Sequence, residues 1–374
     1  MATNFEYIFY GTSCDPGEVD RFMDYVWKTN QELEEAGRRQ TPLCIWGRHG
    51  IGKTDMVAAM AQRHGAAFVS IAPAQFEEMG DLMGMPVVVG DGDQTRVAPP
   101  EWVPQEEGPG VLLIDDVNRA DDRILRGLMQ LFQNYELAGW SLPRRWQIVL
   151  TANPDGGDYS VTPMDDAMLT RMLHVTMRFD VKRWAAWAED AGIDPRGIAF
   201  ALTYPELVTG ERTTPRTLVQ FFERIAGIED LGANLDLVTL LGESCLDKAT
   251  VSAFLSYVQE GLEHLIAPEE ILDAKSNSSV AKRLRALLSE SPPRVDILSA
   301  IATRLAHHLH KQTKPLKKAQ LEGLKHFLLV EGFPEDLRLA LAQELTLLPA
   351  KFGITKLFGD PKLSRLLLSL RSTK

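Results

Sequence analysis

Short apolar runs recur along the first half of the chain, and segments with helical spacing separate them. Short strands that alternate with helices are typical of a parallel sheet that carries helices on both faces. The pattern therefore predicts an α/β fold over residues 40–180. The runs with the length of one strand are 43–46 (LCIW), 68–72 (FVSIA), 111–114 (VLLI), 147–152 (QIVLTA) and 174–179 (HVTMRF).

Helical patterns flank this α/β region on both sides. Residues 17–36 have apolar positions at helical spacing and precede Gly37, which predicts a helix before the first strand. After Asp180 the strand pattern ends, and the remaining segments are helical in pattern. We expect four parts: an N-terminal helical segment (1–39), an α/β domain (40–180), an all-α lid (181–290) and a helical C-terminal extension (291–374).

A glycine-rich turn follows the first strand and has the form G-x-x-x-x-G-K-[ST]. Any glycine-rich turn can match this form by chance, but here a strand precedes it and a helix follows, as the motif requires. Backbone N–H groups and the positive end of the helix would surround phosphate oxygens. Lys53 would reach the β- and γ-phosphates of ATP, and Thr54 would hold Mg²⁺. The predicted nucleotide-binding residues are Gly47, Arg48, His49, Gly50, Ile51, Gly52, Lys53, Thr54 and Asp55.

Polar side chains end the next two predicted strands. Asp115 and Asp116 follow VLLI, at the carboxyl edge where open α/β sheets bind ligands. Asp115 would complete the metal site, and Asp116 would orient the attacking water. Asn153 would hydrogen-bond that water or the γ-phosphate. Without the glycine-rich turn, the acidic pair would be read as a helix cap, and Asn153 before Pro154 as a turn residue.

Composition and charge narrow the function classes. The formal net charge of −11 disfavours a protein that mainly coats nucleic acid. The cysteines Cys14, Cys44 and Cys245 lack metal-ligand spacing and are expected to be reduced thiols. The first residues lack the pattern of a signal peptide, and no apolar run has the length of a spanning helix. We therefore expect a cytoplasmic protein without a membrane segment.

The motifs together resemble those of AAA+ ATPases, and within them the MoxR-like or dynein-related group. The resemblance covers about residues 40–225. It implies a P-loop NTPase fold, a homo-oligomeric and most often hexameric ring, and a protein client, for which a protein with a von Willebrand factor A domain is one candidate. It also implies sensor roles for Asn153 and Arg216 and an arginine finger near Arg171. The stretches that carry it are GRHGIGKT, PPEWVPQEEGPGVLLIDDVNRA, LPRRWQIVLTANPDGGDY, DDAMLTRMLH and TTPRTLVQF.

One position departs from that group, which usually has glutamate where this chain has Asp116. Aspartate withdraws the carboxylate by one methylene, so the resemblance leaves the rate of hydrolysis open while nucleotide binding is still expected. Arg171 has an independent physical case, because a guanidinium at that edge can meet the γ-phosphate in a neighbouring subunit. Arg178 and Arg212 are competitors for this role. A surface arginine that pairs with Asp165 or Asp166 is the alternative.

Residues 76–105 separate two strands by more than a crossover needs, which indicates an insertion, and residues 134–146 are predicted as a hairpin. Tryptophans 102, 140 and 146 in these segments are best explained by packing. The favoured function is a Mg²⁺-dependent ring ATPase that remodels a protein partner. Two alternatives remain: a nucleic-acid motor, with Arg144, Arg145 and the basic run 311–318 as contacts, and a slow nucleotide-gated scaffold. Whether Arg216 acts within its own subunit stays open.

Overall fold

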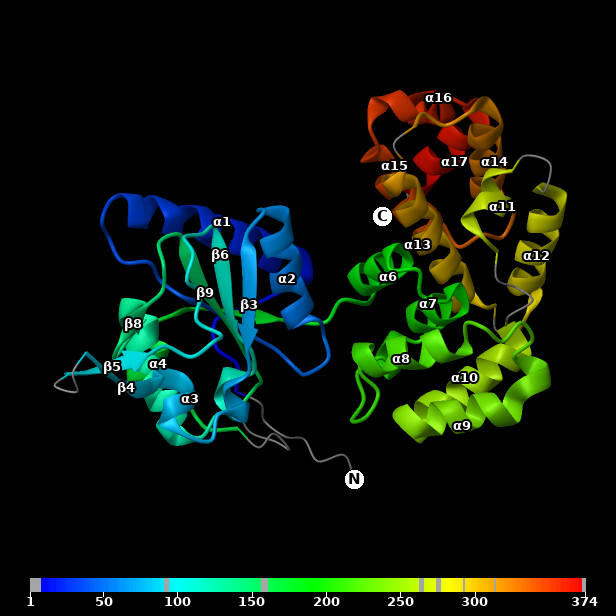
Figure 1. Cartoon of the computed structure of the whole chain (residues 1–374). Helices are drawn as coiled ribbons and strands as arrows, with labels where there is room; N and C mark the ends of the chain where they lie inside the picture. Colours follow the sequence, from blue (N-terminus) through cyan, green and yellow to red (C-terminus); the bar gives the residue numbers. More distant parts are fainter. Residues whose placement is uncertain are drawn as a thin grey trace. The chain divides into compact units, whose positions relative to one another are not determined.

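The computed structural model describes residues 8–90, 94–155, 161–261, 266–273, 277–291, 293–312 and 314–371. The chain divides into two compact units, Met1–Asp180 and Val181–Lys374. Figure 1 shows the sheet in the first unit and the helices of the second. The first unit includes the segment predicted as a separate N-terminal part, except that residues 1–7 lie outside the described residues.

The first unit contains a six-stranded sheet in the order β1-β10-β2-β9-β6-β3, and each neighbouring pair is parallel. All five predicted strands are present, which confirms the α/β fold. The edge strand β1 was not predicted, because only three residues form it. The strands are β1 (Thr12–Cys14), β2 (Leu43–Trp46), β3 (Ala67–Ile71), β6 (Gly110–Ile114), β9 (Trp146–Ala152) and β10 (Leu173–Met177).

Helices cover both faces of the sheet. On one face α1 (Pro16–Glu35) and α2 (Lys53–Arg63) pack on Leu43 and Ile45 of β2. On the other face α4 (Asp122–Asn134) packs in one cluster with Cys44 and Trp46 of the same strand. Successive residues of a strand point to opposite faces, so the run LCIW is buried throughout. An Asp15–Glu18 capping box begins α1, and the chain turns at Gly37 after its end, as predicted.

Two antiparallel hairpins interrupt the α/β alternation. The insertion 76–105 folds as α3 (Met79–Met83) followed by β4 (Met85–Val89) and β5 (Gln94–Ala98). The predicted hairpin at 134–146 is present as β7 (Glu136–Leu137) and β8 (Trp140–Ser141). The hairpins touch, because a Cβ placed on Gly139 would lie 2.5 Å from Cβ of Val97. Trp140 and Trp146 are buried, and the rings of Trp102 and Trp140 meet edge to face at 5.3 Å.

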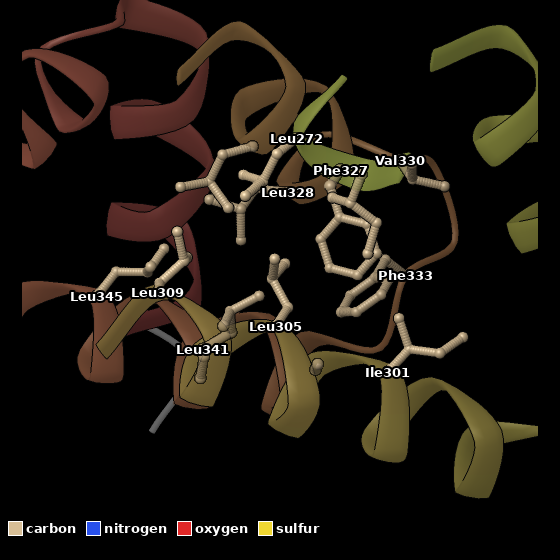
Figure 2. Packing of buried hydrophobic residues seen from close by; sticks show 14 of the residues in the cluster. Leu272, Ile301, Leu305, Leu309, Phe327, Leu328, Val330, Phe333, Leu341 and Leu345 are labelled. Atoms are coloured by element: carbon tan, nitrogen blue, oxygen red, sulfur yellow. The ribbon is translucent and has the colours of Figure 1, made fainter. Parts of the chain in front are cut away.

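The second unit is helical in its described residues and contains two groups of buried side chains. The first group is aromatic and includes Phe200, Phe221, Phe222 and Phe254. The second surrounds α13 (Figure 2). The helices are α6 (Val181–Asp190), α7 (Pro195–Thr203), α8 (Pro215–Ile225), α9 (Leu235–Cys245), α10 (Lys248–Gly261), α11 (Pro268–Leu272), α12 (Asn277–Ser289), α13 (Val295–Lys311), α14 (Lys318–Leu328), α15 (Glu335–Thr346), α16 (Ile354–Phe358) and α17 (Pro361–Arg371).

In the second group, Ile301, Leu305 and Leu309 of α13 pack toward leucines and phenylalanines of α14 and α15 (Figure 2). This cluster contains residues from 266 to 363 and therefore crosses the boundary predicted at 290. Burial of a shared apolar face makes these helices one packed body. The division of the second unit into a lid and an extension stays a prediction. No helix in the described part of the chain is long and apolar enough to span a bilayer.

Candidate nucleotide site

The glycine-rich turn between β2 and α2 leaves no room for side chains at its first position. A Cβ on Gly47 would lie 2.7 Å from Cδ1 of Ile51 and 2.8 Å from the carbonyl oxygen of Met177. Gly52, which precedes α2, has a φ of 94°, a left-handed conformation that glycine adopts without strain. The loop can therefore keep its backbone close to an anion at the start of α2.

Lys53 is the buried cation of this loop and has 6% of its surface exposed. Its ammonium donates to the carbonyl oxygens of Gly47 at 2.7 Å and Arg48 at 3.0 Å. A third, longer contact of 3.4 Å reaches Oδ1 of Asn153 at the end of β9. Backbone carbonyls of the turn thus hold the ammonium group of Lys53, within the loop that the motif predicts to bind phosphate.

The predicted metal-binding pair is in contact. The Thr54 hydroxyl donates to the Asp115 carboxylate at 2.9 Å. The Thr151 hydroxyl of β9 donates to the same oxygen, Oδ1, at 2.5 Å. Hydroxyl and carboxylate oxygens suit Mg²⁺, which prefers hard oxygen ligands and keeps several waters. Thr54 and Asp115 therefore fit the metal that the motif implies.

Asp116 follows in a left-handed backbone conformation, with φ 48° and ψ 46°, which is unusual for a residue with a side chain. Its N–H donates to the hydroxyl of Thr151 at 2.8 Å. Its carboxylate accepts from the amide of Asn153 at 2.9 Å and lies 3.5 Å from Nε of Arg119. The side chain is 36% exposed, so water can reach it. Asn153 thus touches both Lys53 and Asp116 and connects the loop to the acidic pair.

Two residues of the site were not predicted, Asn118 and Thr151. The Asn118 amide donates to the carbonyl of Asn153 at 2.8 Å, and its oxygen accepts from the N–H of Asn153 at 3.1 Å. This reciprocal pair ties the turn after β6 to the end of β9. A signal existed for both residues: Asn118 belongs to the NRA tripeptide, and Thr151 is a polar residue inside a buried strand.

The predicted arginines are not part of this cluster. Arg171 follows α5 (Asp166–Leu169) and donates from Nε to Gln133 of α4 at 3.1 Å and from Nη1 to the carbonyl of Ala167. Among the described residues, no ion pair joins it to Asp165 or Asp166. Arg216 lies in the first turn of α8 in the second unit, with an exposed side chain. The roles of both arginines stay predictions.

His174 of β10 connects the strand before the loop with the turn that carries Arg171. The indole N–H of Trp46 donates to its Nδ1 at 3.0 Å, and its Nε2 lies 2.7 Å from the carbonyl oxygen of Leu169. Because an indole only donates and a carbonyl only accepts, the neutral Nε2–H tautomer is the one that satisfies both contacts. Tyr10 completes the group, with its ring 4.6 Å from that of Trp46.

A parallel sheet with a glycine-rich phosphate loop after β2 and an acidic pair after β6 defines a P-loop ATPase of the AAA+ class. Residues 42–172 match the family model of the AAA domain, dynein-related subfamily. This part of the chain is therefore an AAA domain of the dynein-related subfamily, and the protein is an AAA+ ATPase. The match contains every residue of the loop and of the acidic pair described above.

Solved structures with similar folds include a RuvB variant from Thermotoga maritima, with 13% identity, 83% of this chain and 94% of that chain covered, and a TM-score of 0.39. Another is a protein from Cytophaga hutchinsonii described as a candidate ATPase, with 14% identity, 78% and 81% covered, and a TM-score of 0.33. Because both TM-scores are below 0.5, the assignment rests on the family match and on the site. No curated protein matches the chain.

Proposed function

We propose that the protein is a Mg²⁺-dependent, ring-forming ATPase of the MoxR-like kind that remodels a protein client. The observation that carries the catalytic part is the hydrogen-bonded cluster of Lys53, Thr54, Asp115, Asp116 and Asn153 at one sheet edge. It joins a phosphate-binding cation, a metal-binding oxygen pair and a carboxylate for water. These are the groups that phosphoryl transfer requires, because catalysis there is mostly positioning and charge stabilisation.

Each residue has a defined task in this proposal. Lys53 exchanges its loop carbonyls for phosphate oxygens when ATP enters. Thr54 and Asp115 would hold Mg²⁺, which would supply positive charge against the phosphates. Asp116 accepts a hydrogen bond from the attacking water and orients it toward phosphorus. Asn153 contacts both Asp116 and Lys53 and holds their side chains in position.

The contacts of Asp116 give a reason to expect slow turnover. Its carboxylate is one methylene shorter than the glutamate usual in the group, and Arg119 and Asn153 already approach it. Both groups occupy positions around the carboxylate, so the attacking water must compete with them for its oxygens. We therefore propose that this ATPase hydrolyses slowly and spends most of its cycle with nucleotide bound.

The proposed assembly is a homohexameric ring in which Arg171 meets the γ-phosphate of a neighbouring subunit. Among the described residues, Arg171 forms no hydrogen bond or ion pair with its own phosphate loop, and its present hydrogen bonds are to a glutamine and a carbonyl, which a phosphate can replace. We propose a protein client, with a von Willebrand factor A domain protein as one candidate. The net charge of −11 favours this over a nucleic-acid substrate.

The test is ATP hydrolysis by the full chain with Mg²⁺ and with EDTA, beside the Asp116→Asn variant. We expect hydrolysis that requires Mg²⁺, and an Asp116→Asn variant that binds ATP but does not hydrolyse it. Asp122→Asn is the matched control, because Asp122 is an exposed carboxylate on α4 that pairs with Arg126. Equal turnover in the wild type and in Asp116→Asn would exclude Asp116 as the catalytic carboxylate.

Oligomeric state is tested by sedimentation velocity with ATP, ADP or no nucleotide. We expect Asp116→Asn with ATP to form the largest species, because a γ-phosphate that is not hydrolysed keeps the subunits together. A monomer under all three conditions at micromolar protein would contradict the ring. Client remodelling is tested separately, by asking whether a candidate partner protein accelerates hydrolysis.

A further inference from the structure

Two arginines of the second unit are buried and differ in their contacts. Arg338 on α15 is 5% exposed, donates to the carbonyl of Val330 at 2.9 Å and lies 5.9 Å from the ring centre of Phe333. Arg304 on α13 is 9% exposed. Among the described residues, nothing forms a hydrogen bond or ion pair with Arg304, and its buried Nε lacks an acceptor. The Nε of Arg338 also lacks an acceptor, but its Nη2 hydrogen bond and the Phe333 ring give its guanidinium partners, whereas the guanidinium of Arg304 has none among the described residues.

An uncompensated guanidinium in the interior is unfavourable, because it stays protonated at all physiological pH values. Removing an ion from water without a partner opposes folding. A buried charged group without a partner in a cavity is therefore a candidate ligand-binding group. The position of Arg304 indicates where that ligand would lie.

Arg304 lines a cavity of about 500 Å³ within the second unit, a volume in the range of small-ligand sites. The wall is formed by α13, by the ends of α6, α7 and α11, and by Glu229 in the segment between α8 and α9. Another arginine of the lining, Arg196, is fully engaged: it forms an ion pair with Asp194 and donates to the carbonyls of Ile225 and Ile228. Arg304 therefore provides the guanidinium that remains available in this cavity.

Carboxylates on the same wall restrict the chemistry of the ligand. Glu189, Glu229, Glu269 and Glu270 line the cavity. The Glu269 carboxylate lies 3.3 Å from Nδ1 of His308, and Glu270 forms an ion pair with Arg283 at 2.7 Å. A multiply charged anion such as phosphate would meet repulsion from these groups. A ligand with a single carboxylate for Arg304 and a cationic group beside it would instead find an opposite charge for each end.

We propose that this cavity binds a carboxylate accompanied by a neighbouring cation, with the carboxylate on Arg304 and the cation against the glutamates. Two sources carry this chemistry: a free amino acid, and an acidic residue flanked by basic residues in a peptide. None of the residues that line the cavity belongs to the nucleotide cluster.

The first test needs no ligand and compares Arg304→Met with Arg338→Met in the full chain by urea unfolding. If Arg304 serves a ligand, methionine removes an uncompensated charge and keeps the packing, so the unfolding midpoint of Arg304→Met should equal or exceed that of the wild type. Arg338→Met should lower the midpoint, because it removes a satisfied contact. A midpoint lowered equally in both variants would show that Arg304 is structural and would overturn the proposal.

The second test measures binding by isothermal calorimetry with L-lysine and with the blocked peptide acetyl-Lys-Glu-Lys-amide. The control peptide, acetyl-Lys-Gln-Lys-amide, lacks the carboxylate. We expect one of the two probes to bind the wild type and to lose about thirtyfold or more in affinity in Arg304→Met. Binding of L-lysine alone identifies a small-molecule site, and binding of the peptide alone identifies a peptide site. Failure of both at millimolar concentration, or binding unchanged in Arg304→Met, would overturn the proposal.

Discussion

Lys53 and Arg304 are both buried cations, with 6% and 9% of their surfaces exposed, yet their surroundings differ. The ammonium of Lys53 has two backbone carbonyls and Asn153 as acceptors. Arg304 has no acceptor among the described residues and faces a cavity. A lysine on a flexible stem can be held by neutral acceptors until an anion arrives. A rigid guanidinium needs several aligned acceptors, and among the described residues none of the carboxylates in the cavity wall bonds to it.

The comparison shows two ways in which a protein can accommodate a buried, ligand-binding cation while no ligand is bound. In the nucleotide site the loop supplies substitute acceptors, so the empty site is stable and ATP must displace internal hydrogen bonds. In the proposed second site the empty state keeps an unfavourable charge, so the ligand would stabilise the fold directly. Variants at each cation should therefore change different quantities: hydrolysis at Lys53, and unfolding or ligand affinity at Arg304.

The largest expected effect is on hydrolysis by Lys53→Ala. This change removes the side-chain cation of the phosphate loop and leaves its backbone N–H groups in place, so turnover should fall below detection. ATP hydrolysis with fluorescent nucleotide binding measures both steps. Lys28→Ala is the control, because Lys28 is 75% exposed on α1 and only pairs with Glu32. Turnover within about tenfold of the wild type would mean that hydrolysis does not require Lys53, and Lys53 would then not be a ligand-binding cation comparable with Arg304.

A smaller but still large effect is expected for Arg171→Ala, a third cation that is held by neutral acceptors like Lys53 but is partly exposed. An arginine finger contributes about 10³–10⁵ in turnover, so hydrolysis should fall by orders of magnitude while nucleotide affinity stays nearly unchanged. Mixing Arg171→Ala with Lys53→Ala subunits tests action between subunits. Partial recovery in rings shown to be mixed supports it, and no recovery contradicts it.

The third prediction concerns stability of the nucleotide site and targets Asn118. Asn118→Ala leaves the N–H and the carbonyl of buried Asn153 without their partner, and each unsatisfied group costs about 1–3 kcal/mol. Thermal unfolding should show a loss of about 2–6 kcal/mol together with reduced hydrolysis. Asn118→Asp keeps the acceptor for the N–H but buries a charge and sets an oxygen against the carbonyl of Asn153, so it should lose at least as much. Wild-type stability in both variants would mean that the paired amide is not what positions Asn153.

The smallest effect is expected at His174. Glutamine offers one acceptor and one donor, as the neutral imidazole does, whereas phenylalanine offers neither and leaves the N–H of Trp46 without its acceptor. His174→Phe should therefore lower turnover severalfold with little change in ATP affinity, and His174→Gln should recover part of it. Steady-state kinetics separates these quantities. A higher KM with unchanged kcat in His174→Phe would contradict a link between the loop strand and the turn of Arg171.

The sequence was informative where function depends on local motifs. The strand runs, the glycine-rich loop and the acidic pair could be predicted because turn chemistry, strand length and motif spacing are local properties. Asn118 and Thr151 were missed because their importance comes from contacts across the sheet, 35 and 36 residues away along the chain. Arg304 could not be predicted at all, since only packing of α13 against distant helices shows that its charge is uncompensated. Edge strand β1 has only three residues, which is too few to show the alternation of apolar and polar positions that predicts a strand.

The contact between Val97 and Gly139 has a mechanical consequence. Strand β5 rests on the tip that joins β7 to β8, and a short segment after β8 continues into β9, whose end carries Asn153. A force on the β4–β5 hairpin would therefore be transmitted through the β7–β8 hairpin to β9, which pairs with β2 on one side and with β6 on the other. Because the Asn153 amide donates to the Asp116 carboxylate, a displacement of either hairpin would reach the acidic pair through β9.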